Sequence, residues 1–327
     1  MKASVIVPAF NAERTIKDCI TSLIGQNFNK ADYEIIVVDD GSTDTTAEIV
    51  AASAVKYIYK PNGGPASARN LGVKEATGEI ILFTDSDCIA TPEWLTEMLK
   101  PFSDPMVKAV KGAYKTPLKS PTARFAQVEF EERYEMLKKA PSIDMIDTYS
   151  AAFRKEIFDM TGGFDESFPV ANNEDTELSY KLSGWGLKMV FNPDAIVNHM
   201  GHPASVLRYA KIKFWRGYWR MAVYRKFPGK MVKDTYTPQT LKAQILALFS
   251  SMFSLLLIPL FFDTFLDLPI IFVAAVSILG FLASTVPFTL FALKRDTLTG
   301  LLSPLFLALR AASIGSGVLF YAIRQVP

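Results

Sequence analysis

Two pairs of closely spaced carboxylates follow apolar runs in the N-terminal half of the chain. Asp39 and Asp40 come directly after "YEIIVV", and Asp85 and Asp87, separated only by Ser86, follow "GEIILFT". Like charges this close repel each other and are costly to desolvate, a cost that a bound cation reverses. Hard carboxylate oxygens suit Mg²⁺ or Mn²⁺. The spacing therefore indicates either a cation site with an anionic ligand or a solvated acidic turn.

The polar ends of several predicted strands favour the first of these readings. Up to about His202, short β-rich runs alternate with helix-compatible segments, which predicts βαβ units, a mostly parallel sheet and an α/β fold. "SVIVPAFN", "YEIIVVDDGSTD", "VKYIYKPNGG" and "GEIILFTDSD" each end in polar, acidic or glycine residues. Carboxyl ends of parallel strands lie on one edge of a sheet, where such sheets bind ligands, so the four ends predict one shared site.

Composition and motifs narrow the class of protein. Half of the 327 residues are hydrophobic and the net charge is only +2, which does not indicate a nucleic-acid partner. Cys19 and Cys88 lack metal-ligand spacing and fit a reduced, cytosolic setting, and the N-terminal apolar run is too short for a signal peptide. G-x-G-x-x-G after the first strand, a P-loop and an EF-hand are absent. What remains is a nucleotide held by its base and ribose, with its diphosphate on a divalent cation.

Several of these segments together resemble family 2 inverting glycosyltransferases with the GT-A fold. The resemblance is carried, in this order, by "SVIVPAFNAE", "VVDDGSTD", "GGPASARNLGVKEATGEIILFTDSD", "GGFDESF" and "NEDTELSYKLSGWG", and it ends near His199. It implies a Rossmann-like, mostly parallel sheet. It also implies transfer of a sugar from a nucleoside diphosphate donor, a UDP- or GDP-sugar, to a hydroxyl with inversion at the anomeric carbon.

The resemblance implies roles for the residues at the first strand ends. Pro8 and Phe10 would line the pocket for the base. Asp40 would accept a hydrogen bond from the base, and Asp39 would be structural. Arg69, in "ASARN", would lie near the base and the diphosphate. These side chains also have ordinary structural interpretations, namely a core aromatic, a helix cap and a surface charge.

The resemblance also implies a metal site and a catalytic base. Asp85 would contact the ribose or a metal-bound water, Asp87 would ligate Mg²⁺ or Mn²⁺, and His199 would complete the metal site. Loss of the acceptor's hydroxyl proton needs one carboxylate base. Of the adjacent pair in "NNEDTELSYKL", Asp175 would be the base and Glu174 would help to bind the acceptor or orient the loop, although a helix cap is the structural alternative.

Some positions depart from the family's pattern, and they lie on the acceptor side. Lys181 stands where arginine is common, and Thr148-Tyr149-Ser150 stands where glycine and asparagine often occur. Q-x-x-R-W, the signature of processive polysaccharide synthases, is missing, which favours transfer of a single sugar. A processive synthase-like enzyme, a nucleotidyltransferase-like enzyme and a non-catalytic nucleotide-binding membrane protein stay open as alternatives.

The C-terminal part of the chain has a different character. We predict a GT-A domain over 1–203, basic amphipathic interfacial helices over 204–240 and a transmembrane region over 241–327. Three apolar stretches in the last region each have the length needed to cross a bilayer: Leu241 to Phe262, Pro269 to Phe291 and Leu301 to Ile323. Arg310 within the third stretch is expected to face the bundle interior or a lipid phosphate.

Flanking charges predict the orientation in the membrane. Lys242 lies near the start of the first stretch, and Lys294 and Arg295 lie between the second and third. The charged residues of the loop between the first and second stretches are Asp263 and Asp267. Positive charge marks the cytoplasmic side. We therefore expect a multi-pass protein of the cytoplasmic membrane with its catalytic domain in the cytosol and Pro327 outside. A lipid-linked acceptor, such as a polyprenyl phosphate or a glycolipid, follows from this placement.

Overall fold

The computed structural model describes residues 2–168 and 173–324, which form two units. The N-terminal unit comprises Met1–Leu118 and Tyr134–His202, and the C-terminal unit comprises Lys119–Arg133 and Pro203–Pro327. The segment before Tyr134 thus belongs with helices that follow it by more than seventy positions in the chain.

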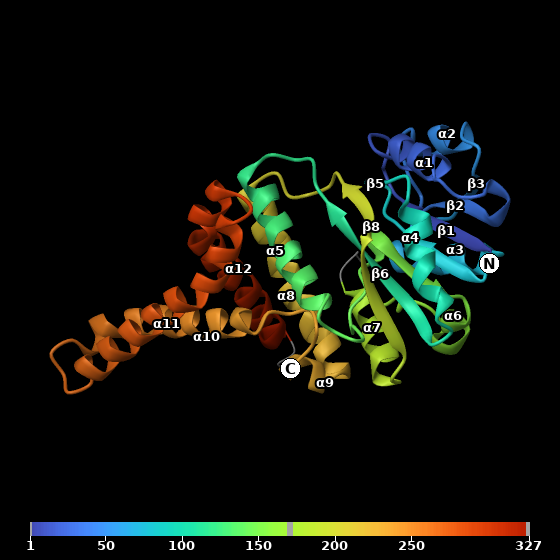
Figure 1. Cartoon of the computed structure of the whole chain (residues 1–327). Helices are drawn as coiled ribbons and strands as arrows, with labels where there is room; N and C mark the ends of the chain where they lie inside the picture. The colour runs from blue at the N-terminus through green and yellow to red at the C-terminus, as the bar shows by residue number, and fades with distance from the viewer. Residues whose placement is uncertain (1, 169–172, 325–327) are drawn as a thin grey trace. The chain divides into compact units, whose positions relative to one another are not determined.

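One mixed sheet forms the centre of the N-terminal unit (Figure 1). Its strands follow the order β3-β2-β1-β4-β7-β6-β8-β5. In chain order they are β1 (Ala3–Ala9), β2 (Tyr33–Asp39), β3 (Lys56–Tyr59), β4 (Ile80–Phe83), β5 (Cys88–Ala90), β6 (Val107–Lys115), β7 (Ala151–Arg154) and β8 (Lys188–His199). The four strands at the β3 end of the sheet pair in parallel, whereas β7 is antiparallel to both of its neighbours. The predicted α/β fold with a mostly parallel sheet is confirmed.

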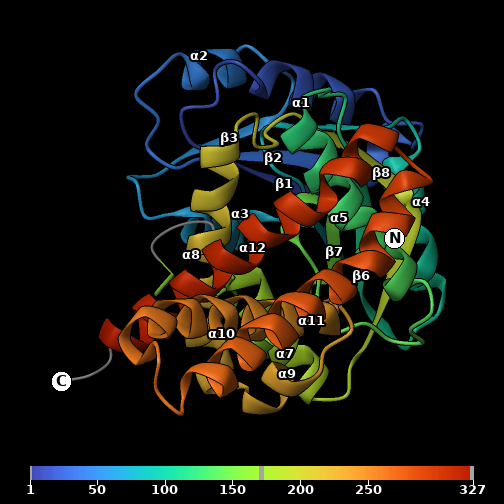
Figure 2. The ribbon, with the colours of Figure 1, turned by 90° about the vertical axis from the view of Figure 1, so that its left-hand side faces the viewer.

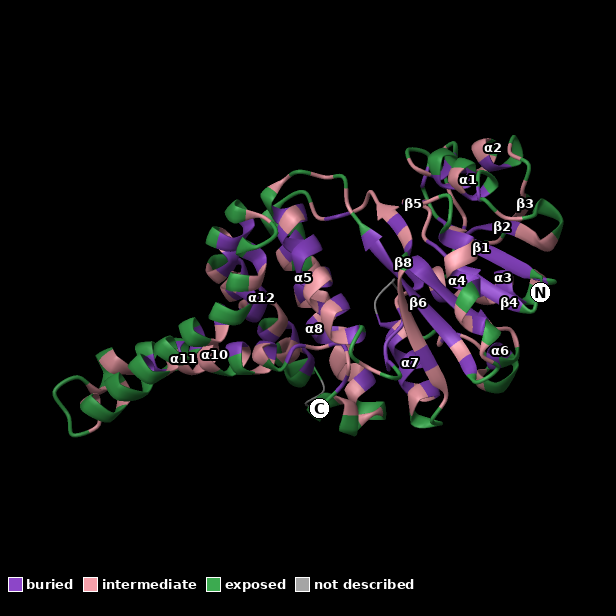
Figure 3. Ribbon diagram, viewed as in Figure 1, coloured by how far each residue is buried: buried purple, intermediate pink, exposed green. Residues whose placement is uncertain are grey.

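Strands β1, β2 and β4 are apolar because both faces of the sheet are covered. Burial is almost continuous along them, as expected for parallel strands between helices (Figure 3). Phe83 at the end of β4 packs against the rings of Phe153, Phe158 and Phe164, with centroids 5.3–6.0 Å apart. This aromatic cluster fixes the end of the strand from which the "DSD" turn departs.

Short helices connect the strands of the N-terminal unit. They are α1 (Ile16–Ile24), α2 (Thr46–Ala51), α3 (Pro65–Glu75), α4 (Trp94–Leu99), α6 (Glu156–Thr161) and α7 (Glu174–Gly184). Gly72 lets α3 pack closely on β1, because a Cβ there would lie 2.4 Å from Ile6 Cγ2. This close contact fixes the position of α3 against strand β1.

The C-terminal unit is helical. It contains the first part of α5 (Pro121–Leu137) together with α8 (Val206–Lys226), α9 (Pro228–Val232), α10 (Gln239–Phe261), α11 (Asp267–Leu293) and α12 (Thr297–Arg324). Helices α10 and α11 form an antiparallel hairpin with largely exposed apolar side chains (Figures 2 and 3). By length and composition, α10, α11 and α12 could each cross a membrane.

Candidate active site

The register of two antiparallel strands brings Asp87 next to His199. Strand β5 pairs with β8 so that Cys88 lies opposite His199, and the backbone N–H of Met200 donates to the carbonyl of Asp87 at 2.9 Å. His199 Nε2 lies 3.7 Å from Asp87 Oδ1. The imidazole also stacks on the ring of Tyr114, with centroids 5.2 Å apart, which restricts its orientation. Two residues predicted for a metal site are thus placed together by the sheet.

The chemistry of this cluster fits a hard divalent cation. Potential ligand atoms of Asp87, Cys88 and His199 all lie within 4.8 Å of one another. Burial raises the pKa of the Cys88 thiol well above its ordinary value. The Asp87 carboxylate is the donor of this cluster that suits Mn²⁺ or Mg²⁺, and the His199 imidazole offers a further ligand atom beside it. Gly201 is required beside them, because a Cβ there would lie 2.0 Å from Asp87 Oδ2.

The carboxylates that follow β2 hold the neighbouring turns in place. Asp39 is fully buried and accepts hydrogen bonds from Tyr57 Oη at 2.9 Å and from the Ser42 N–H at 2.9 Å. This agrees with the structural role expected for it. At the tip of β1, the Asn11 side chain accepts from the Thr43 N–H at 2.8 Å, so the loops after β1 and β2 are joined.

Asp40 organises the "KPNGG" turn that leads into α3. Its carboxylate accepts from Lys60 Nζ at 2.5 Å and from the N–H groups of Gly63 and Gly64 at 2.9 and 2.8 Å. Gly64 has a φ of 89°, which disfavours side chains at this position. Asp40 is therefore buried against donors of its own chain and positions the start of α3.

Arg69 on α3 joins the "DSD" turn to the Glu-Asp pair. One guanidinium nitrogen donates to Glu174 Oε1 at 2.7 Å and another to Asp85 Oδ1 at 3.1 Å. Burial acts to lower the pKa of Arg69, but Glu174, Asp85 and Asp175 outweigh it and raise the pKa. Asp85 and Glu174 thus share one buried cation, and Arg69 lies 105 positions before Glu174 in the chain.

The two acidic residues at the start of α7 have different surroundings. Glu174 is buried and engaged by Arg69, whereas Asp175 is half-buried. Oδ1 of Asp175 accepts a hydrogen bond from the Thr176 N–H at 2.7 Å at the start of the helix. The predicted division between an orienting Glu174 and a basic Asp175 is compatible with this geometry.

Pro8 and Phe10 lie at the carboxyl end of β1, beside the end of β2. Pro8 is opposite Val38 in the parallel register. The Phe10 side chain is 51% exposed, so its burial in the core is excluded and an apolar surface is open at the strand end. A planar base stacked on this ring is chemically compatible with the site.

Sequence reasoning missed several polar residues in this unit. Lys60 was detectable, since it follows β3 at the same edge of the sheet as the acidic turns. Buried Lys111 pairs with Asp147 and donates to Tyr149 Oη at 3.1 Å, an arrangement without a sequence signal because its partners lie more than thirty positions away. The Lys111 ammonium also lies 4.9 Å from the Tyr149 ring centroid.

Known proteins share both the sequence pattern and the fold. Residues 4–161 match the family model described as "Glycosyl transferase family 2". The chain is 43% identical over 103 residues to poly(ribitol-phosphate) beta-N-acetylglucosaminyltransferase TarS of Staphylococcus aureus, which covers 30% of this chain and 18% of that protein. It is 24% identical over 220 residues to the glycosyltransferase AglE of Haloferax volcanii, which covers 65% of this chain and 72% of AglE. This chain therefore spans less than a fifth of the length of TarS.

Two solved structures have a similar fold. The mannosyltransferase PcManGT of Pyrobaculum calidifontis, in complex with GDP-Man and Mn²⁺, matches with a TM-score of 0.60 at 19% identity, over 99% of this chain and 88% of that one. Staphylococcus aureus TarS in complex with UDP-GlcNAc matches with a TM-score of 0.51 at 22% identity, over 99% and 93% of the two chains. Together with the ordered motifs and the sheet, these matches show that residues 4–161 form a domain of glycosyltransferase family 2 with a GT-A-like fold and that three long apolar helices follow it in the chain.

Proposed function

We propose that this glycosyltransferase transfers a single sugar from a UDP- or GDP-sugar to a hydroxyl or phosphate of a lipid-linked acceptor, with a divalent cation at Asp87 and His199 and with Asp175 as the base. The observation that supports this most directly is the linkage of the "DSD" turn to the start of α7 through Arg69. This linkage ties the side chains assigned to the donor to those assigned to the acceptor.

The donor side follows from the residues at the strand ends. Phe10 offers an exposed aromatic face for the base, and Asp40 holds the turn that begins α3. A cation bound at Asp87 and His199 would supply positive charge for the leaving diphosphate, as Mn²⁺ accompanies GDP-Man in PcManGT. Charge on the departing group is then balanced without a protonating side chain.

On the acceptor side, the reaction requires a base that removes the proton of the acceptor hydroxyl and a group that orients the surrounding turn. Asp175 is partly exposed at a helix start, and we assign it the role of accepting the proton of the acceptor hydroxyl. Glu174 forms a buried ion pair with Arg69, and we assign it the role of orienting the turn. In this proposal Asp175 is the general base and Glu174 has a positioning role.

The lipid acceptor is supported by the C-terminal unit. Three helices are apolar enough to cross a membrane, and α8 is strongly basic. A glycosyltransferase held at the cytosolic surface meets nucleotide sugars from the cytosol and anionic lipid head groups in the same leaflet. The catalytic unit is accordingly placed on the cytosolic side.

A donor panel tests the proposal. Purified full-length protein is incubated with UDP- and GDP-sugars, polyprenyl phosphate or glycolipid acceptors, and Mg²⁺ or Mn²⁺. Release of nucleoside diphosphate that requires the lipid supports the proposal, whereas pyrophosphate release would indicate a nucleotidyltransferase. A soluble sugar that outcompetes every lipid acceptor would refute the acceptor assignment alone, and repeated addition of sugar to one acceptor would indicate a processive enzyme.

A further inference from the structure

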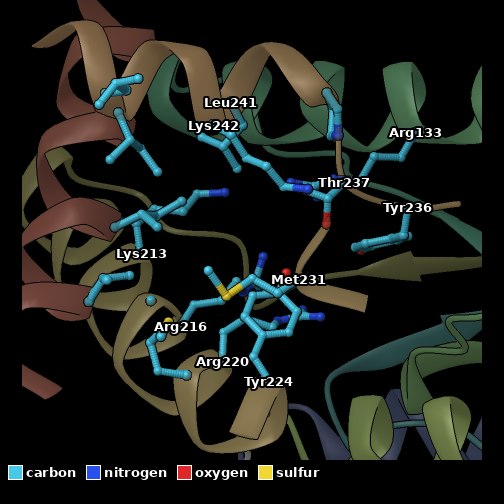
Figure 4. A pocket seen from close by; sticks show the side chains of 17 residues that line it. Arg133, Lys213, Arg216, Arg220, Tyr224, Met231, Tyr236, Thr237, Leu241 and Lys242 are labelled. Carbon is cyan, nitrogen blue, oxygen red and sulfur yellow. The ribbon is translucent and has the colours of Figure 1, made fainter. Parts of the chain in front are cut away.

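A pocket of about 370 Å³ opens within the C-terminal unit, in the size range of small-ligand sites (Figure 4). It lies among α8, α9, α10 and α12 and the segment that precedes α10. Lys213, Arg216 and Arg220 of α8 line it, and they share one face because they are three, four and seven positions apart. Lys242 of α10 and Arg133 of α5 add two further cations.

The rest of the wall is mostly apolar. Leu241, Ile245 and Leu246 of α10 line it together with Ile314 and Val318 of α12. None of the 17 lining residues, all within the described part of the chain, carries a carboxylate. The pocket thus combines a cluster of positive charge with the apolar surface of two long helices.

One buried carboxylate near the pocket is shared between two cations. Glu129 of α5 is fully buried and already engages Lys213 at 2.8 Å and Arg310 at 3.1 Å. Burial, with repulsion from Arg216 and Arg133, lowers the pKa of Lys213 to about 7 despite its carboxylate partner. An added anion would relieve this repulsion.

The position of the pocket along the helices indicates a membrane-surface site. Helix α8 carries seven Lys or Arg among its 21 residues and no Asp or Glu, so it cannot enter the hydrocarbon. Leu241 begins the apolar run of α10 immediately after the polar Pro238–Thr240 segment. The cationic wall therefore lies at head-group depth, and the apolar wall continues toward the hydrocarbon.

We propose that this pocket binds the phosphate head group of a membrane lipid, with Arg216, Arg220 and Lys242 around the phosphate and the lipid chain along Ile245 and Leu246. Arginine suits this task because its planar guanidinium forms paired hydrogen bonds with phosphate oxygens. Binding at this site does not require the proposed transfer reaction and can be measured without a sugar donor. Loss of lipid binding and loss of glycosyl transfer can therefore be told apart.

A lipid-binding measurement tests the site. Full-length protein in neutral detergent is titrated with dioctanoyl phosphatidic acid, dioctanoyl phosphatidylcholine and inorganic phosphate, and bound lipid is counted by native mass spectrometry. Phosphatidic acid should bind in preference to phosphatidylcholine. The double substitution Arg216→Ala/Arg220→Ala should weaken phosphatidic acid binding by at least about tenfold, since charge-assisted hydrogen bonds are lost.

Matched variants make the result specific. Arg208→Ala/Lys211→Ala removes the same charge from exposed positions of the same helix outside the pocket and should change affinity less than twofold. Arg216→Lys/Arg220→Lys retains the charge and should keep part of the affinity, which separates binding from misfolding. Equal losses in the two alanine pairs would overturn the proposal. Inorganic phosphate binding as tightly as phosphatidic acid would overturn the lipid assignment.

A second, independent observation concerns α12, which packs along two charged helices. Near its start, Asp296 accepts from Arg124 of α5 at 3.1 Å, and farther along Arg310 donates to Glu129 of α5 at 3.1 Å. Its second half lies on α8, where a Cβ on Gly317 would meet the Phe214 carbonyl oxygen at 2.1 Å. Small residues at this contact let the two helix backbones approach each other closely.

These partners determine where α12 can lie. Six of the 17 residues of α5 are charged, and α8 is basic throughout, so neither helix is compatible with hydrocarbon surroundings. The exposed side of α12 is an apolar stripe of large residues. This stripe consists of Leu298, Leu301, Leu305, Leu319 and Ile323. Within this unit, α12 runs transverse to the α10–α11 hairpin (Figures 1 and 2).

We infer that only α10 and α11 cross the bilayer and that α12 lies in the membrane surface, with its apolar stripe toward lipid and its other face on α5 and α8. The end of α12 at Arg324 is then on the same side of the membrane as α8. This arrangement replaces the three-span topology expected from apolar length alone.

Cysteine labelling in intact cells of an expression host tests this topology. Both native cysteines, Cys19 and Cys88, are buried, so background labelling by a membrane-impermeant maleimide is low. Arg324→Cys and Lys211→Cys on α8 should give the same result, either both labelled or both protected from the reagent. Phe265→Cys in the hairpin loop should give the opposite result. Arg324→Cys labelling together with Phe265→Cys would overturn the inference, as would identical labelling of Phe265→Cys and Lys211→Cys.

Discussion

Removal of the Arg69 side chain should destabilise the catalytic unit strongly. In Arg69→Met the apolar stem is kept, but Glu174, only 2% exposed, loses the cation that lies 2.7 Å away. Breaking a buried ion pair by removal of one partner costs about 3–5 kcal/mol. Each kcal/mol lowers the melting temperature of a domain of this size by roughly 2–4 °C, so a decrease of about 6–20 °C is expected.

A double-mutant cycle isolates the electrostatic part of this loss. Glu174→Gln removes the buried negative charge and keeps the shape of the side chain, so Arg69→Met/Glu174→Gln should be more stable than Arg69→Met alone. Residues in direct contact show coupling energies of about 0.5–3 kcal/mol. The conservative change Arg69→Lys should recover little, because an ammonium cannot reach both Glu174 and Asp85 as the guanidinium fork does.

Thermal unfolding of the detergent-solubilised full chain, followed by the fluorescence of buried Trp94, measures these effects. Lys56→Met is a matched control, because its ion pair with Glu75 is exposed and contributes at most about 1 kcal/mol. If Arg69→Met melts within about 2 °C of the wild type, or if Glu174→Gln gives no rescue, the buried pair is not a stabilising link between the two halves of the site.

Four further predictions follow from the described contacts. Asp87→Ala should abolish metal-dependent turnover and weaken donor binding, measured by diphosphate release with and without chelator; full wild-type activity in chelator would contradict the metal site. Asp175→Asn should slow the chemical step by about 10²–10⁴-fold with little change in donor affinity, and near-normal turnover would exclude it as the base. Burial opposes ionisation of Glu34, but hydrogen bonds from two hydroxyls hold its pKa below the ordinary value. Its stabilising effect is therefore present above about pH 4.3 and lost as the pH falls through the lowered pKa, so the melting difference between wild type and Glu34→Gln should shrink in acid. Glu129→Gln should cost about 3–5 kcal/mol because two buried cations lose their partner, whereas Glu131→Gln, in a part-exposed pair, should cost about 1 kcal/mol or less in the same assay.

The N-terminal fold was predictable because its signals are local. Apolar runs such as Ile35–Val38 and Ile80–Phe83 are short and bounded by turn residues, and strands of this kind alternate with helical segments. Parallel strands then place their carboxyl ends at one edge without further information. The "DSD" turn and the "DDG" turn could accordingly be assigned to one region before any coordinates were known.

Which partner each site residue would take could not be read from the chain. The contacts of the Arg69 guanidinium with Asp85 and Glu174 arise because the start of α7 folds back onto α3, and no local pattern indicates them. The proximity of Asp87 and His199 depends on the register between β5 and β8, and a shift of one residue would reverse the side-chain directions.

The C-terminal helices show the same division between local and tertiary information. Residue composition by itself determined that three segments are long and apolar enough to cross a membrane, since hydropathy is a property of each segment alone. Only the tertiary structure placed Arg310 of α12 against Glu129, 181 positions earlier, and filled one face of that helix with α5 and α8. A helix enters lipid or lies on its surface according to what covers its polar groups, and that covering comes from contacts distant in the chain.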